Sequence, residues 1–357
     1  MYRKWLYCLN FYFNFLFGAL IPLMPLIDEE KTGQAFSAFS LAKVLLYLPA
    51  GYLVDKWSPK AVLWLALIAQ AMAFFIFAFV PEMALVARLA EGGALAMGTI
   101  GALSLLRLIN DHYDGFKRDI SLLMLFGGVA FLVAPLSTYL LLMVSLQFTL
   151  YFLFGFSLLM LILALYFNRI SVTAMTETFK DNEKQKAPIF SFILCLFLVK
   201  AFMFGYNPNL AWWMDQEFHF SPLVSGFYFF GLGVAFLGGC AYQKKIYISL
   251  GAISYLGLEG SLYYQIPWFW FICLVGVAFW MGQFITRSIA FLGWSDPIGL
   301  GKHNSYWLLF TDLGMIVTPV LFWQWRDQED FRLRTITIFV IIVMSVVAFI
   351  KGKREAA

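Results

Sequence analysis

GYLVDKWSPK, residues 51–60, links two long apolar runs, 35–54 and 61–80, and its last six residues, 55–60, form a short polar turn between them. Each run has about the 20 residues that a helix needs to cross the roughly 30 Å hydrocarbon core of a bilayer. The stretch therefore predicts a hairpin of two membrane-spanning helices. Within it, Gly51 permits close approach of another helix, and the carboxylate of Asp55 can accept hydrogen bonds from N–H groups at the start of a helix.

Similar apolar runs extend along the whole chain. Hydrophobic residues make up 62% of the 357 residues and charged residues 13%, which is more apolar side chain than one soluble core can bury. The runs are long and continuous, as in helices, and unlike the short alternating strands of a membrane barrel. We therefore predict an all-α polytopic membrane protein with twelve spanning helices, and not a cytosolic enzyme. The predicted spans are 5–27, 35–54, 61–80, 84–106, 119–143, 146–167, 189–213, 222–242, 246–263, 268–292, 305–325 and 335–350.

The basic residues indicate which side of the membrane each loop occupies. With the N-terminus inside, most Lys and Arg residues outside the spans fall on inner segments, as expected for cytoplasmic loops. Both termini are therefore predicted to be cytoplasmic. The run 5–27 lacks a cleavage pattern and should remain as the first span, and the compact loops favour a bacterial inner membrane. A net charge of +4 without a basic cluster predicts no nucleic-acid partner.

A hydrophilic break at 168–188 divides the predicted spans into six and six. Features of the first half recur in the second at a nearly constant offset, for example Val-Ala-Pro ending at Pro135 and Val-Thr-Pro ending at Pro319. This favours an N-terminal six-helix bundle (1–167), a cytoplasmic linker (168–188) and a homologous C-terminal bundle (189–357).

Three segments resemble the major facilitator superfamily. Residues 51–60 are similar to its loop signature G-x-L-x-D-R/K-x-G-R/K-R/K, although Ser58 and Pro59 replace the second Gly and a basic residue. Residues 88–94, RLAEGGA, resemble its R-x-x-Q/E-G-x-G-A element. Residues 18–25, GALIPLMP, resemble the glycine and paired prolines of its drug and metabolite proton-antiporter branch. The resemblance covers nearly the whole chain and implies two pseudo-symmetric bundles that alternate access.

The resemblance also implies which residues act in the conformational change. In this family the 51–60 loop contacts span 11, here expected to begin near 304–305, and latches the halves together on the cytoplasmic side. The alternative is an ordinary polar turn with cytoplasmic lysines. The residues expected to act in gating are Gly51, Asp55, Lys56, Lys60, Pro135 and Pro319.

Ionisable side chains inside spans are the candidates for a transport site, because they cost several kcal/mol when they face lipid. Either Glu91 or Asp312 would carry a proton, and the positive residues would attract an anionic or zwitterionic substrate. Alternatively, Arg88 and Glu91 form a static pair that fixes span 4. Asn14 either lines the cavity or packs helices together. The full candidate set is Lys43, Arg88, Glu91, Lys200, Asp312 and Asn14.

These features predict a secondary active transporter that moves a small organic solute across the membrane by alternating access, in the mode of proton-coupled efflux or antiport. The chain has no phosphate-binding loop for ATP, so an ion gradient would supply the energy. The alternatives are uptake of an organic anion by proton symport and an intramembrane lipid-modifying enzyme, for which Asn110, Asp111 and His112 are the one candidate cluster. We predict no catalytic residue, no metal and no cofactor, and a monomer in the lipid bilayer.

Overall fold

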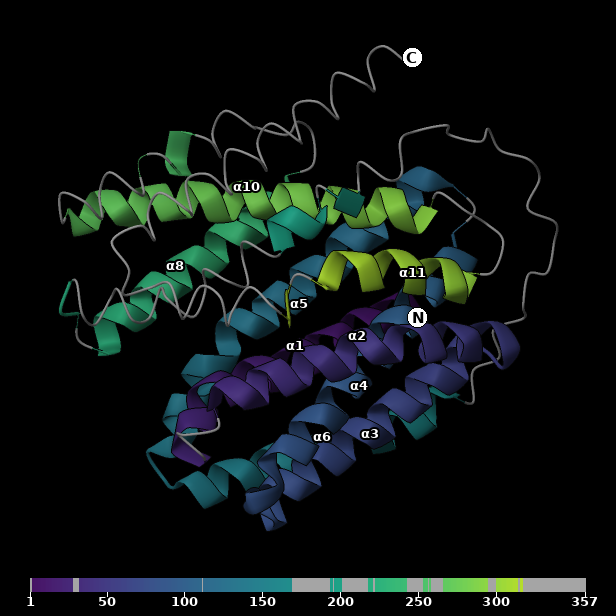
Figure 1. The fold of residues 1–357 in the computed structure, drawn as a ribbon, viewed down its shortest axis with the longest axis horizontal. Coiled ribbons are helices and arrows are strands. Elements are labelled where there is room, and N and C mark those ends of the chain that lie inside the picture. The colour runs from purple at the N-terminus through teal and green to yellow at the C-terminus, as the bar shows by residue number, and fades with distance from the viewer. Residues whose placement is uncertain are drawn as a thin grey trace. The chain divides into compact units, whose positions relative to one another are not determined.

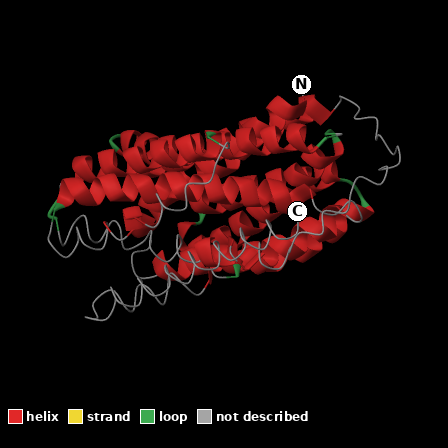
Figure 2. Cartoon of the chain, turned by 90° about the horizontal axis from the view of Figure 1, so that it is seen from above, coloured by secondary structure: helices red, strands yellow, loops and turns green. Residues whose placement is uncertain are grey.

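The computed structural model describes most of the first half of the chain and part of the second. The described residues are 2–27, 32–110, 112–168, 193–194, 196–200, 218–220, 222–242, 253–255, 257, 266–294, 300–313 and 315–316. All regular structure in these ranges is helical, and Figure 2 shows helices joined by short loops. The prediction of an all-α fold is therefore confirmed.

The first six predicted spans correspond to six long helices. Their ends lie close to the predicted ends, and a short 3-10 turn, η1, precedes α4. The largest difference is at α5, which begins about two turns before 119 because polar residues form its first turns. The helices are α1 (Tyr2–Ile27), α2 (Thr32–Lys56), α3 (Pro59–Phe79), η1 (Pro81–Met83), α4 (Ala84–Leu108), α5 (Tyr113–Leu142) and α6 (Leu146–Asn168).

Three further helices are described in the second half of the chain. They are α8 (Pro222–Ala241), α10 (Pro267–Trp294) and α11 (Leu300–Asp312). α11 begins at Leu300, about one turn before the predicted start of span 11 near 304–305, because a polar first turn precedes the apolar run. The predicted spans 189–213, 246–263 and 335–350 lie largely or wholly outside the described residues, so the count of twelve stays a prediction.

Seven helices of the described part are long and apolar enough to cross a membrane. Large apolar side chains are also exposed along them, for example Leu45 on α2 and Ile162 on α6. An apolar outer surface of this extent suits lipid and would be unusual in water. The chain is a multi-pass membrane protein.

The chain divides into two compact units. One comprises Met1–Lys184 with Gly293–Leu309, and the other comprises Gln185–Leu292 with Phe310–Ala357. In the first unit α4 packs against both α2 and α3, α1 packs against α5, and α3 also packs against α6, which lies beside it in Figure 1. The proposed boundaries of the two six-helix bundles stay a prediction.

Small residues allow the close contact between α2 and α4. Gly92 is buried, and a Cβ atom at this position would overlap the backbone oxygen of Phe39. Helices in a membrane associate through such close backbone approach, because lipid offers no hydrophobic driving force. The glycines of the 88–94 element therefore place Arg88 and Glu91 inside the unit, and not at its lipid-facing surface.

The turn between α2 and α3 is fixed by a helix cap. Ser58 has an extended backbone, and its Oγ atom accepts a hydrogen bond from the N–H of Ala61 at 3.1 Å. Pro59 occupies the first helical position, where a missing N–H costs nothing. The two residues that depart from the family loop signature are thus the ones that start α3.

Candidate functional site

Asp55, near the end of α2, caps the first turn of α11. Its Oδ1 atom accepts a hydrogen bond from the N–H of Gly301 at 2.8 Å, and its Oδ2 atom accepts one from the N–H of Lys302 at 3.0 Å. The first N–H groups of a helix have no partners within the helix and carry a partial positive charge, which a carboxylate satisfies. The end of α2 and the start of α11 are therefore joined by charge-assisted hydrogen bonds.

Two glycines bring these elements into backbone contact. A Cβ atom on Gly51 would overlap the Gly301 backbone and the Ser305 hydroxyl, and a Cβ atom on Gly301 would overlap the Gly51 backbone oxygen. The same helix contacts α4, because Asn304 Nδ2 donates to Ser104 Oγ at 3.3 Å. The first half of α11 thus packs on α2 and α4 within one compact unit.

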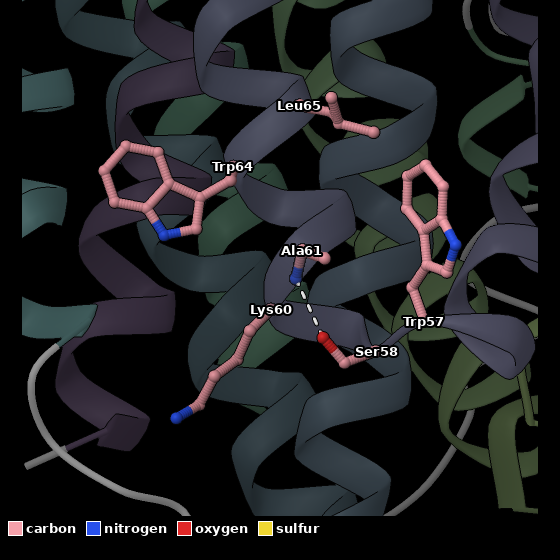
Figure 3. Close-up of a pocket in the computed structure, with 6 residues that line it drawn as sticks. All are labelled: Trp57, Ser58, Lys60, Ala61, Trp64 and Leu65. Carbon is pink, nitrogen blue, oxygen red and sulfur yellow. Dashed lines mark hydrogen bonds between the residues drawn. The ribbon is translucent and has the colours of Figure 1, made fainter.

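The two lysines of the loop have different surroundings. Lys56 is exposed, and its Nζ atom lies 5.6 Å from the centroid of the Tyr52 ring. The Nζ atom of Lys302 lies 5.9 Å from the same centroid. Lys60 is half-buried and lines a surface pocket at the start of α3 (Figure 3).

Arg88 and Glu91 form an ion pair inside α4. Both side chains are fully buried, and the Arg88 Nη1 atom donates to Glu91 Oε2 one turn along the helix. The guanidinium carbon also lies 4.6 Å from the ring centroid of Phe39 and 4.9 Å from that of Phe36, within the range of cation–π attraction. A local pair of this kind keeps its geometry as long as the helix is intact.

Several polar atoms of this pair have no hydrogen-bond partner among the described residues. They are Nε and Nη2 of Arg88 and Oε1 of Glu91. A buried polar atom without a partner costs about 1–3 kcal/mol, and more when it is charged. The Arg88 atoms can therefore donate hydrogen bonds to a water molecule, and Glu91 Oε1 can accept a hydrogen bond from water or bind a proton.

Lys200 and Asp312 form a second buried pair, in the other unit. The Nζ atom of Lys200, in the helical segment 196–200, donates to Asp312 Oδ1 at the end of α11 and to Thr311 Oγ1 at 3.2 Å. The side chains are 10% and 1% exposed. Two candidates that the sequence analysis treated separately are thus brought together by the fold.

The other two candidates lie elsewhere in the first unit. Lys43 is half-buried on α2, with its Nζ atom 5.9 Å from the ring centroid of Tyr47. Asn14 donates to the backbone oxygen of Asn10 at 2.7 Å, and Asn10 donates to the backbone oxygen of Leu123 at 2.7 Å. Asn14 also lies close to Gly127 of α5, so it is at the contact between α1 and α5. Its role in lining a cavity stays a prediction.

The gating prolines and the candidate enzyme cluster are only partly described. Pro135 lies inside α5 and is half-buried, and Pro319 lies outside the described residues. Of the candidate enzyme residues, Asp111 is outside the described residues, and His112 is exposed just before α5. The Asn110 side chain is engaged in a hydrogen-bond network.

Sequence reasoning did not identify the centre of this network, Asp119. Its carboxylate accepts a hydrogen bond from the Tyr7 hydroxyl at 2.8 Å and one from Asn110 Nδ2 at 2.8 Å, and it pairs with Arg3 at 3.0 Å. The network joins the start of α1, the end of α4 and the start of α5. The available signal was an acidic residue at the predicted start of a span, but its partners are too distant in sequence to be deduced.

The sequence profile of the Major Facilitator Superfamily matches residues 5–319. The chain belongs to the Major Facilitator Superfamily. As a member of this superfamily it is a transporter and not an enzyme, so the lipid-modifying alternative is set aside.

Solved structures of this superfamily share the fold. The chain is similar to the human organic anion transporter MFSD10 (TETRAN), with a TM-score of 0.78, 14% identity, and coverage of 96% of this chain and 98% of that one. It is similar to the fucose:proton symporter FucP of E. coli, with a TM-score of 0.73, 16% identity, and coverage of 97% and 98%. A bacterial homologue of the iron transporter ferroportin gives a TM-score of 0.76, 14% identity, and coverage of 99% and 100%. None of the curated protein sequences matches.

Proposed function

We propose that this Major Facilitator Superfamily member moves a small organic solute across the membrane by proton-coupled alternating access, with efflux by antiport as its direction. The solute is drug-like or a metabolite. The monomer is the working unit, with both termini cytoplasmic and the chain in a bacterial inner membrane. The resemblance of residues 18–25 to the proton-antiporter branch supports the direction.

The observation that carries this proposal is the buried Lys200–Asp312 pair. The partners are 112 positions apart in sequence and belong to different helical segments. A pair between segments can separate when the segments move, whereas the Arg88–Glu91 pair lies three residues apart within one helix. The Lys200–Asp312 pair is therefore the better candidate for a step that depends on conformation.

The cost of breaking this pair supports proton coupling. A buried carboxylate without its cation is strongly disfavoured, so it takes up a proton when the cation leaves. When the site opens to water and Lys200 returns, the proton is released. Asp312 thus carries the proton, and Lys200 controls when it is bound.

The pairing of the cations bears on the choice of substrate. Arg88 and Lys200 are each paired with a carboxylate, so each pair has a net charge near zero. A neutral pair attracts an organic anion less than an isolated cation does. The arrangement supports proton exchange over uptake of an organic anion driven by positive potential.

Gating rests on the contact around Asp55. We assign the latch to Gly51 and Asp55, with Lys56 and Lys60 as its flanking charges. Pro135, inside α5, and Pro319, in the predicted span 305–325, are proposed to accommodate bending. Release of the N–H groups of α11 by Asp55 would accompany opening on the cytoplasmic side. The hydrogen bonds to Gly301 and Lys302 support this role.

Vesicles with an imposed pH gradient test the proposal. Purified protein is reconstituted, and uptake and efflux of candidate metabolites and antibiotics are measured with the gradient in each direction. We expect solute to move in the direction opposite to the protons. A pH-sensitive dye in the more acidic compartment should report a rise in pH during transport. Flux that is the same with and without the gradient would rule out proton coupling, and solute movement together with protons would rule out antiport.

A further inference from the structure

A pocket of about 460 Å³ lies at the turn between α2 and α3, away from the buried ion pairs. It is lined by Trp57, Ser58, Lys60, Ala61, Trp64 and Leu65. Figure 3 shows the indole rings of Trp57 and Trp64 on either side of the first turns of α3, with the Lys60 side chain on the side of Trp64. The pocket thus combines two large amphipathic rings with one cation.

The pocket lies where two spanning helices end. Lys56 is the last residue of α2 and Pro59 the first of α3, so the pocket is at the level of the lipid headgroups. Trp57 is 59% exposed, although it is one of the largest apolar side chains of the unit. Trp64 is half-buried. Indole rings at this level suit the boundary between headgroups and acyl chains, where one end of the ring is wet.

An apolar stripe continues from the pocket along α3. Trp64 is followed at four-residue intervals by Ile68 and Met72, which are 47% and 53% exposed. Residues four apart share a helix face. From Lys60 to Met72 the rise is about 18 Å, which is close to one leaflet with its headgroup layer. A slanted row along α3, which turns by about 40° around the helix at each step, therefore offers a cation at the headgroup level and apolar side chains where an acyl chain would lie.

The positive charge around the pocket favours a lipid with an anionic headgroup. Lys56 and Lys60 are the ionisable residues between 56 and 80, and both are basic. We propose that this pocket is a binding site for an anionic phospholipid of the surrounding bilayer, with the phosphate at Lys60, the headgroup between the two indoles and an acyl chain along Trp64, Ile68 and Met72.

Lipid titration of the full chain tests the site. The purified protein is delipidated in detergent, and its unfolding temperature is measured with added phosphatidylglycerol or phosphatidylcholine of the same chains. We expect stabilisation at lower concentrations of phosphatidylglycerol. Lys60→Gln should weaken the apparent affinity for phosphatidylglycerol about fivefold, since one basic residue near a membrane surface contributes about that factor. Lys60→Arg should retain the affinity.

Two further variants make the result specific to this pocket. Lys117→Gln removes a half-buried lysine from the first turns of α5, at the same end of the first unit, and should leave the affinity unchanged. Trp57→Ala changes an exposed ring without opening the core and should weaken the binding of both lipids. Equal responses to the two lipids, or equal effects of Lys60→Gln and Lys117→Gln, would overturn the proposal. Because lipid binding is measured without transport, failure here would leave the proposed function untouched.

Discussion

The ammonium group of Lys200 donates a hydrogen bond to the carboxylate of Asp312, and both side chains are buried. Thr311 adds a second acceptor to the same ammonium at 3.2 Å. Within the described residues, this buried pair brings opposite charges together from different helical segments. Its partners therefore respond to movement of those segments, unlike the partners of a pair within one helix.

Replacing Asp312 should separate proton coupling from substrate binding. Asp312→Asn removes the group that we assign as proton carrier but retains its size and its ability to accept a hydrogen bond from Lys200. We expect transport driven by a pH gradient to fall to the level of empty vesicles, while exchange of labelled for unlabelled solute persists. The control is Asp114→Asn, an exposed acid in the first turn of α5. Gradient-driven transport by Asp312→Asn at the wild-type rate would show that another group carries the proton.

The Arg88–Glu91 pair should behave as a structural unit. Arg88→Leu leaves the Glu91 carboxylate buried without its cation, which costs about 3–5 kcal/mol in comparable buried pairs. Arg88→Leu combined with Glu91→Leu removes both charges and should recover most of the unfolding temperature. The measurement is thermal unfolding in detergent. A double variant that is stable but inactive in exchange would instead assign the pair to the transport site.

A side chain at Gly51 should disrupt the contact with α11. A Cβ atom there would overlap the Gly301 backbone, which cannot move aside as a flexible side chain can. We expect Gly51→Ala to destabilise the protein by about 1–3 kcal/mol, the usual cost of overpacking. Gly155→Ala on α6 is the matched control, because a Cβ atom at that position has no neighbour within 4 Å. Equal unfolding temperatures for the two variants would contradict the close contact.

The hydrogen bonds of Asp55 should protect the first turn of α11 from hydrogen exchange. Asp55→Asn removes the negative charge that favours the helix N-terminus, an effect of up to about 1 kcal/mol. We therefore expect amide exchange in a peptide covering 300–304 to rise up to about fivefold, because a local opening of lower free energy is populated more often. Glu82→Gln, in the exposed turn η1, should leave this peptide unchanged. An unchanged rate of amide exchange at 300–304 in Asp55→Asn would contradict the proposed role of Asp55 in the latch.

Much of the fold follows from local sequence, whereas the pairing of charges does not. The runs of apolar residues located α1 to α6 because span length is set by bilayer thickness. The helix α11 begins before the predicted start of span 11. Gly301 and Lys302 interrupt the apolar run, but they can begin the helix because Asp55 accepts hydrogen bonds from their N–H groups. The contacts of Asp119 with Tyr7 and of Lys200 with Asp312 depend on which helix faces meet, and one sequence does not specify that.

The meeting of Gly51 and Gly301 has a mechanical consequence. Because neither residue has a side chain, the two backbones are in direct contact, and no flexible side chain of either residue lies between them. Backbone atoms cannot overlap, so the distance between α2 and α11 at this contact has a well-defined minimum. In the proposed gating cycle, this backbone contact would limit how closely α2 and the start of α11 can approach each other.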